Sequence, residues 1–388
     1  MEQPSKPIFY IATATSLVVI GDTLLYTILP SYYSRMGLAP YQVGLLLSVN
    51  RWVRLTTNHL SVYSYRRYPS ELWLLGSFFF GAVVSAIYGT VNVFIVLLAA
   101  RILWGLCYSF IRQAGIMTAV NAGDPIHLGK RMGFYRGVSS LWQGLGVFLG
   151  GLSHDAFGFS ITLVAISIFS LSAIPLGDLS QKGLKQVSPS PLGVQLGGGD
   201  FGITVCGFSL GVVGSGLIMS TLGLVIKERI GESFYIFGYA IGVVTLTATI
   251  LSSRWVIDAI FSPILGTAAD SVGRERSIIF LFALGGLVMF STTLSAGPIW
   301  LVFVVLLCFI CGGTLYMLLS GRAGRHGIRS LASFVTAYDL GSSLGPSIGW
   351  SITQFGLPSH FIFVTAGTFY LLGAIASYGS LHKGRATL

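Results

Sequence analysis

Long apolar stretches alternate with short polar connections along almost the whole chain. An α-helix of about 20 apolar residues is long enough to cross the roughly 30 Å hydrocarbon layer of a membrane. The pattern predicts twelve such helical segments, at residues 8–30, 41–62, 71–90, 92–120, 131–153, 159–177, 202–226, 235–262, 277–296, 298–320, 330–354 and 358–381. Most connections are only a few residues long, so they leave no room for a soluble domain.

The composition indicates that lipid surrounds most of the chain. Of 388 residues, 53% are apolar and 9% are charged, and the mean hydropathy is +0.78. The net charge of +10 is dispersed over short loops, which argues against a nucleic-acid partner. Lys and Arg are concentrated in the loops on the side of the two termini, so the positive-inside rule predicts that both termini are cytoplasmic.

Two short sequences recur in the two halves of the chain. Arg51-Trp52-Val53 returns as Arg254-Trp255-Val256 and Ser139-Ser140-Leu141 returns as Ser342-Ser343-Leu344, each at an offset of 203 positions. Tyr135 and Tyr338 match at the same offset. A repeat at one offset, with charges inside apolar stretches, is typical of a duplicated membrane bundle. The cleft between two such halves is where a solute is expected to bind.

Residues 181–200 form the longest polar stretch and are rich in Gly and Pro, which is typical of a linker. We therefore predict an N-terminal six-helix bundle at 1–180, a cytoplasmic linker at 181–200 and a C-terminal six-helix bundle at 201–388.

One loop signature links the chain to a known family. The sequence from Gly266 through Asp270 and Gly273 to Arg274 and Arg276 resembles the G-x-x-x-D-R-x-G-R-[RK] signature of the major facilitator superfamily, with a serine in place of the first arginine. Arg101-Ile-Leu-Trp-Gly105 is similar to the R-x-x-x-G signature of the same family. Together with the twelve segments and the half-repeat, the resemblance covers essentially the whole chain.

The resemblance implies an all-α membrane protein in which twelve transmembrane helices form two pseudo-symmetric six-helix bundles. It also implies secondary transport by alternating access. Asp270 with Arg274 or Arg276 would form a charge-assisted latch that favours one access state, with Gly266 and Gly273 shaping the loop. The alternative is a charged loop that serves only membrane topology.

Arginines inside apolar segments are candidates for solute binding, because a charge at mid-bilayer costs at least about 2.5–3.5 kcal/mol. Arg51 and Arg254 are repeat mates near mid-depth, and two guanidinium groups facing one cavity would bind an anion. Other residues expected near the solute are Arg54, Asn58, Arg101, Trp52 and Trp255. The alternative is that Arg254 pairs with Asp258 one turn further on and Arg51 pairs with another helix, which would leave no free charge for a solute.

Carboxylates inside apolar segments are candidates for proton coupling. Asp22 is the first candidate, because desolvation makes a buried carboxylate easier to protonate, and Asp339 and Asp258 are further candidates. The alternative for Asp22 is a permanent ion pair with Arg101. Asp339 would similarly pair with Arg136, its own repeat mate.

No catalytic motif is evident in the sequence. We find no Ser/His/Asp set, no HExxH and no Walker-type loop, so neither an enzyme nor ATP-driven transport is expected. The four cysteines lie within apolar segments and the six histidines are scattered, so we expect no disulfide framework, metal or other cofactor.

The sequence therefore predicts a monomeric secondary transporter of the cell inner membrane, which moves a small organic or anionic solute with protons. The alternatives are a proton antiporter that exports drugs or metabolites, and a receptor or assembly factor that uses the same scaffold without transport.

Overall fold

The computed structural model describes residues 6–67, 70–123, 127–182, 201–236, 239–294 and 297–386. The first half of the chain forms α1 (Lys6–Tyr32), α2 (Pro40–Arg67), α3 (Ser70–Thr90), α4 (Phe94–Asn121), α5 (Leu128–Phe157), α6 (Phe159–Ser170) and α7 (Ala173–Gln181). The second half forms α8 (Phe201–Leu210), the π-helix η2 (Gly211–Ile218), α9 (Met219–Ile230), β1 (Ser233–Ile236), β2 (Tyr239–Gly242), α10 (Val243–Val272), α11 (Arg274–Ser291), α12 (Pro298–Arg325), α13 (Ile328–Gln354) and α14 (His360–Ala386). Most of the predicted linker at 181–200 lies outside the described residues.

The helical membrane architecture is confirmed. Among the described residues, eight helices or continuous helix runs are long and apolar enough to cross a membrane: α1, α3, α4, α6 with α7, α8 to α9, α10, α12 and α14. The remaining long helices α2, α5, α11 and α13 carry more polar or charged residues. Of these, α2, α5 and α13 hold the recurring sequence positions, which is expected of helices that face a polar interior.

One predicted segment is wrong in its first part. The segment expected at 235–262 begins with the antiparallel hairpin β1–β2, in which Ser233 pairs with Gly242 and Ile236 with Tyr239. Aromatic and β-branched residues favour strands, and the Val243 N–H donates to the Glu232 carbonyl oxygen at 3.0 Å to close the base of the hairpin. Helix α10 therefore starts only at Val243.

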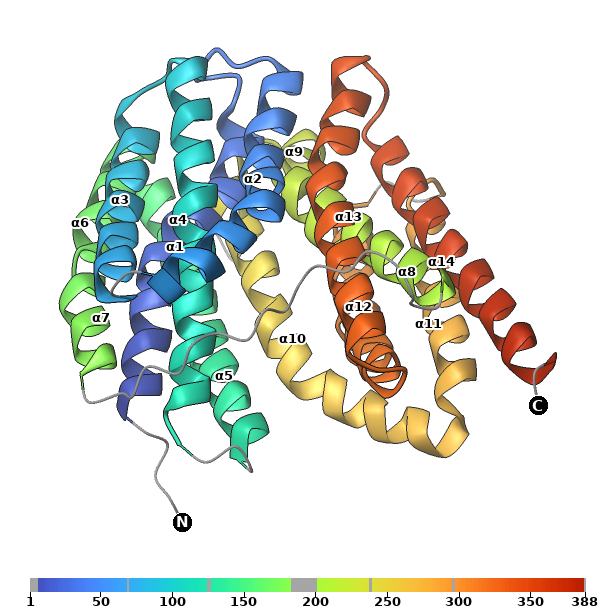
Figure 1. Cartoon of the computed structure of the whole chain (residues 1–388). Helices are drawn as coiled ribbons and strands as arrows, with labels where there is room; N and C mark the ends of the chain where they lie inside the picture. Colours follow the sequence, from blue (N-terminus) through green and yellow to red (C-terminus); the bar gives the residue numbers. More distant parts are fainter. Residues whose placement is uncertain are drawn as a thin grey trace. The chain divides into compact units, whose positions relative to one another are not determined.

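The contacts divide the chain into two compact units, which are described separately. The first unit holds residues 1–28, 52–193 and 244–252, and the second holds 29–51, 194–243 and 253–388. In the first unit, α3 packs beside α4 and α6 (Figure 1). The fully buried Trp104 and Tyr88 lie in this core. The prediction of bundles at 1–180 and 201–388 stays a prediction.

In the second unit, η2 packs closely against α13. A side chain at Gly211 would collide with the Tyr338 carbonyl group, and one at Gly216 would lie 2.7 Å from the Cα of Gly345. Small residues allow two membrane helices to approach until their backbones touch. The irregular π-helical turn is therefore held directly against α13.

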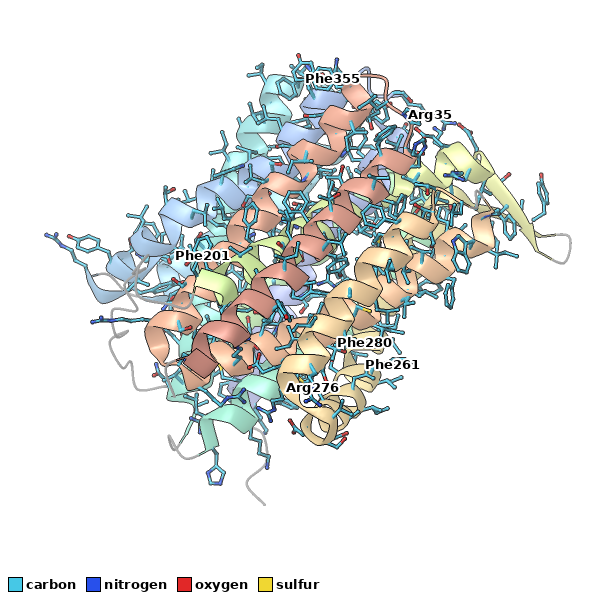
Figure 2. The ribbon with its side chains drawn as sticks, turned by 90° about the vertical axis from the view of Figure 1, so that its right-hand side faces the viewer. Arg35, Phe201, Phe261, Arg276, Phe280 and Phe355 are labelled. Atoms are coloured by element: carbon cyan, nitrogen blue, oxygen red, sulfur yellow. The ribbon has the colours of Figure 1, made fainter. Side chains whose placement is uncertain are left out.

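The two ends of the second unit carry charged groups, and its flanks carry exposed aromatic side chains. Figure 2 shows Arg35 at one end and Arg276 at the other. Phe201 and Phe280 point outward between these ends (Figure 2), with 80% and 62% of their surface exposed. Exposed phenylalanines of this kind fit a lipid-facing surface.

Candidate functional site

Arg51 is anchored within the second unit by two backbone carbonyl groups. Its Nη1 donates to the carbonyl oxygen of Ser215 in η2 at 2.8 Å and to that of Ser342 in α13 at 2.6 Å. The partners of this nitrogen are thus neutral, and the positive charge of Arg51 is not cancelled by these contacts.

Arg254 of α10 reaches the same cluster from another side. The hydroxyl of Ser215 lies 2.6 Å from the hydroxyl of Tyr338, and Tyr338 in turn lies close enough to Arg254 to interact with it electrostatically. Ser215 and Tyr338 therefore link the two arginines that the half-repeat singled out. We call Arg51, Ser215, Tyr338 and Arg254 the arginine cluster.

The carboxylate nearest to Arg254 is only a loose partner. Nε of Arg254 lies 3.9 Å from Oδ2 of Asp258, and the two side chains are 25% and 38% exposed. Nη1 of Arg254 instead donates to Sδ of Met219 at 2.9 Å. The i+4 pair anticipated as an alternative is present, but at this distance it is no close ion pair. Asp258 packs against Gly313, where any larger residue would collide with the carboxylate.

The arginine cluster has the chemistry of an anion site. A guanidinium carries five N–H donors in a planar fork that matches carboxylate and phosphate oxygens. Two such groups linked through Ser215 and Tyr338 concentrate positive charge, and Asp258 lies loosely beside one of them. Aromatic rings also border the cluster, since the guanidinium of Arg254 lies 6.0 Å from the Phe309 ring centre and the Tyr316 ring lies 5.0 Å from that of Tyr338.

In the first unit, Asp22 forms an ion pair with Arg101. The Arg101 side chain is fully buried and that of Asp22 is 15% exposed. Nη2 of Arg101 also donates to the Tyr26 hydroxyl at 3.4 Å, and the guanidinium lies 5.8 Å from the Tyr88 ring centre. The pairing anticipated as the alternative for Asp22 is therefore the arrangement present in this structure.

The other predicted solute contacts on α2 belong to the first unit. The guanidinium of Arg54 lies 5.0 Å from the ring centre of Tyr108, close enough for a cation–π contact. Asn58 is half-buried and accepts a hydrogen bond from Ser61 through its carbonyl oxygen, and Trp52 is exposed. Roles for Arg54, Asn58 and Trp52 in solute binding stay predictions.

Two further predicted residues lie in the second unit near the arginine cluster in sequence. Trp255 follows Arg254 and is half-buried, and Asp339 follows Tyr338 and is half-buried. The carbonyl oxygen of Asp339 accepts a hydrogen bond from Ser343 at 2.7 Å. Their predicted roles, stacking for Trp255 and proton coupling for Asp339, stay predictions.

The signature loop forms ion pairs at the end of α10. Asp270 pairs with Arg274 across one turn, and Gly273 between the helices has φ +109°, a conformation that favours glycine. Glu275 pairs with the buried Arg322 of α12 at 2.5 Å, while Arg276 is exposed at this end (Figure 2). Gly266 packs against Met317. The loop thus ties α10 and α11 to α12.

The Asp270–Arg274 pair is expected to be insensitive to pH in the physiological range. The hydrogen bond from Arg274 and its positive charge hold the pKa of Asp270 below its ordinary value of 3.8. A lowered pKa means that the stabilisation is present above the ordinary value and is lost only as the pH falls through the lowered one. The thermal unfolding temperature of Asp270→Asn should therefore differ from that of the wild type by the same amount at about pH 5 and about pH 8. A difference in unfolding temperature that is smaller at about pH 5 than at about pH 8 would contradict this assignment.

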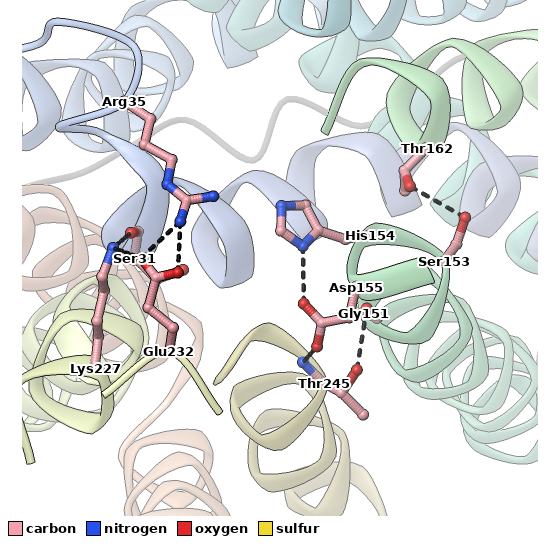
Figure 3. Close-up of polar contacts among 10 residues, drawn as sticks. All are labelled: Ser31, Arg35, Gly151, Ser153, His154, Asp155, Thr162, Lys227, Glu232 and Thr245. Carbon is pink, nitrogen blue, oxygen red and sulfur yellow. Dashed lines mark hydrogen bonds and ion pairs between the residues drawn. The ribbon is translucent and has the colours of Figure 1, made fainter. Parts of the chain in front are cut away.

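Two polar networks found in the structure were not anticipated from the sequence (Figure 3). In the second unit, Glu232 accepts hydrogen bonds from Arg35 at 2.6 Å, and Lys227 donates to the Ser31 carbonyl oxygen at 2.8 Å. The Arg35 hydrogen bonds and charge hold the pKa of Glu232 below its ordinary value of 4.5. These contacts fasten the end of α1 to the hairpin region.

In the first unit, the carboxylate of Asp155 accepts a hydrogen bond from the Thr245 backbone N–H at 2.8 Å, and the Thr245 hydroxyl donates to the Gly151 carbonyl oxygen at 3.2 Å. Thr245 lies in the first turn of α10, where a carboxylate stabilises the exposed N–H groups of the helix. This network holds the start of α10 on α5 (Figure 3).

Sequence reasoning missed Ser215 and Tyr338 as members of the arginine cluster and Met219 as a contact of Arg254. A signal for Tyr338 was present, because Tyr135 is its repeat mate. Nothing in the sequence distinguishes Ser215 or Met219 from the other residues of an apolar helix.

Comparison with known proteins agrees with this architecture. The sequence profile of the Major Facilitator Superfamily matches residues 11–346. An uncharacterised MFS-type transporter of Methanocaldococcus jannaschii is 23% identical over 162 residues, which is 42% of each chain. The match thus spans less than half of that relative.

Solved structures share the fold over almost the whole chain. A bacterial homologue of the human lysosomal transporter Spinster, in an inward-facing and occupied conformation, has a TM-score of 0.79 with 12% identity and covers 98% of both chains. A peptide transporter in complex with alafosfalin has a TM-score of 0.78 with 12% identity, covering 98% of this chain and 94% of the other. The nucleoside transporter NupG has a TM-score of 0.73 with 12% identity, covering 97% and 99%.

The chain is a multi-pass membrane transporter rather than an enzyme. It belongs to the Major Facilitator Superfamily, as the profile match shows.

Proposed function

We propose that the protein is a secondary transporter of a small anionic solute, and that Arg51 and Arg254 bind this solute. The observation that carries the proposal is the convergence of both guanidinium groups on Ser215 and Tyr338. Two backbone carbonyl oxygens hold Nη1 of Arg51 in place, and Oδ2 of Asp258 lies 3.9 Å from Nε of Arg254. A carboxylate or phosphate on the solute would accept charge-assisted hydrogen bonds from both guanidinium groups.

Proton coupling is assigned to Asp22 in the same proposal. Protonation of Asp22 would remove its attraction to Arg101 and leave the buried guanidinium to its tyrosine partners. Protonation would thereby shift the first unit from one conformation to another. Proton coupling requires such a shift. The inner-membrane location and cytoplasmic termini inferred from the loop charges are part of this proposal.

The test begins with a ligand screen on the purified protein. A bound ligand raises the unfolding temperature, and the stabilisation grows with the logarithm of the ligand's excess over its dissociation constant. We expect stabilisation by members of an anion panel of phosphate, nitrate, acetate, succinate and citrate, and no stabilisation by neutral sugars at the same concentration.

Replacing either arginine should weaken binding of the stabilising anion. A charge-assisted hydrogen bond contributes about 1.5–3 kcal/mol, so Arg51→Ala and Arg254→Ala should each raise the dissociation constant by roughly 10- to 100-fold. Isothermal calorimetry on the wild type and variants measures this change. The matched control is Arg67→Ala on the same helix α2, because Arg67 is exposed and donates to the Tyr63 hydroxyl instead.

The outcomes separate the competing functions. Flux into proteoliposomes of an anion driven by a pH gradient, lost in both arginine variants, supports the proposal. Flux of neutral or cationic compounds that survives both substitutions would replace it with an exporter. A protein that transports none of the panel but retains a stable protein partner would indicate a receptor.

A further inference from the structure

The two carbonyl groups that hold Arg51 both lie at irregular points of their helices. In an α-helix, the carbonyl of residue i accepts from the N–H of residue i+4. The residue four positions after Ser342 is Pro346, which lies inside α13 and has no N–H. The Ser342 carbonyl therefore lacks its regular helical donor, and Nη1 of Arg51 lies 2.6 Å away.

The Ser215 carbonyl is left without its α-helical donor for a different reason. It lies in the π-helix η2, and the Met219 N–H that would reach it in a regular α-helix donates to the Gly216 carbonyl oxygen instead. Such π-helical insertions are frequent at functional sites. The same nitrogen of Arg51 lies 2.8 Å from this second carbonyl.

The first half of the chain handles the equivalent carbonyl groups differently. At the offset of 203 positions, Ser215 corresponds to Ala12 and Ser342 corresponds to Ser139. The hydroxyl of Ser16 donates to both of these carbonyl oxygens, at 2.8 Å to Ala12 and 3.2 Å to Ser139. A serine of α1 thus bridges α1 to α5 in the way that Arg51 bridges η2 to α13.

Two substitutions between the halves explain this difference. The repeat mate of Ser16 is Met219, whose thioether has no proton to donate. The repeat mate of Gln143 is Pro346, so the N–H present in α5 is missing in α13. At both positions the second half has lost a donor that the first half keeps.

We propose that Met219 and Pro346 are positioning residues for Arg51. By withholding a hydroxyl and an N–H, they reserve the Ser215 and Ser342 carbonyl groups for the guanidinium and so fix its position and orientation. The value of this for solute binding rests on the function proposed above, but the positioning itself does not depend on the identity of the solute.

The experiment restores one donor at a time and measures how exposed Arg51 becomes to a chemical probe. Met219→Ser supplies a hydroxyl at the place of Ser16, and Met219→Ala is its matched control, because it loses the same thioether contact with Arg254 without adding a donor. Pro346→Ala supplies the missing N–H independently. Phenylglyoxal modifies arginines, and peptide mass spectrometry gives the rate at Arg51 relative to the exposed Arg276 in the same sample.

We expect Arg51 to be modified roughly three- to tenfold faster in Met219→Ser than in Met219→Ala, and likewise faster in Pro346→Ala than in the wild type. The reason is that a competing donor weakens the charge-assisted hydrogen bonds from Arg51 to the Ser215 and Ser342 carbonyl oxygens. Equal rates in both comparisons would overturn the proposal. If one variant does not fold, as judged by size-exclusion chromatography, the other decides.

The same variants separate this inference from the proposed function. Faster modification of Arg51 with unchanged binding of the stabilising anion supports the positioning role and counts against Arg51 as a solute ligand. Unchanged modification, with anion binding still lost in Arg51→Ala, overturns the positioning role and leaves the proposed function intact.

Discussion

Asp22→Asn should destabilise the protein by about 3–5 kcal/mol, which is the usual cost of removing one partner from a buried ion pair. Arg101 is fully buried, and a guanidinium cannot shed its charge at any accessible pH. The Tyr26 hydroxyl at 3.4 Å and the tyrosine rings offset part of this cost but supply no negative charge. Unfolding in detergent, followed by fluorescence against denaturant, measures the loss.

The reciprocal variant should be milder, and this asymmetry is the sharper test. In Arg101→Met, the remaining carboxylate of Asp22 can take up a proton and become neutral, so its burial costs less. The deficit of this variant should shrink further as the pH is lowered, whereas that of Asp22→Asn should not. The double variant should be more stable than Asp22→Asn alone, because no unpaired charge remains. Equal losses in both single variants at every pH would show that Arg101 is held mainly by its tyrosine neighbours.

The half-repeat and the apolar pattern allowed most of the helices and both arginines of the cluster to be predicted. A repeated Arg-Trp-Val inside an apolar stretch is informative because charged residues are costly in lipid and need a reason to be there. Asp22 and Arg101 were recognised as a potential pair for the same reason. Both inferences depend on side-chain identity, which is known directly from the sequence.

The partners of Arg51 could not be predicted, because they are backbone carbonyl groups. Every residue carries one, so Ser215 and Ser342 gain their role from helix geometry rather than from residue type. Pro346 did signal an unclaimed carbonyl on α13, but nothing in the sequence indicated that α2 would reach it. The π-helix was hidden likewise, since a run of small and apolar residues fits an α-helix equally well.

The start of α10 was misjudged for a related reason. Aromatic and aliphatic residues at 234–241 continue the apolar stretch of the helix, so hydropathy alone merges them with it. In the structure, residues 233–236 and 239–242 pair as two antiparallel strands, and the Val243 N–H donates to the Glu232 carbonyl oxygen. Apolar character says that a segment avoids water, but the hydrogen-bonding pattern decides its secondary structure.

Gly345→Leu should have the second large effect, because the site depends on backbone contact between η2 and α13. A side chain at Gly345 would meet the Cα of Gly216 and lie 2.6 Å from the Val212 carbonyl oxygen. Backbone atoms cannot turn aside as side chains do, so the helices must separate. Overpacking typically costs about 1–3 kcal/mol, and a bulky residue against backbone should reach the upper end of that range or prevent folding.

Separation of these helices should also release Arg51, since one nitrogen can bridge the Ser215 and Ser342 carbonyls only while η2 and α13 touch. Gly345→Ala is the gentler variant, and we expect a lower unfolding temperature together with faster phenylglyoxal modification of Arg51. The matched control is Gly214→Ala in the same π-helix, because a methyl group there meets nothing within 4 Å. That control should leave both measurements near the wild-type values, and a comparable loss in it would mean that the π-helix tolerates no added side chain at all, whatever it faces.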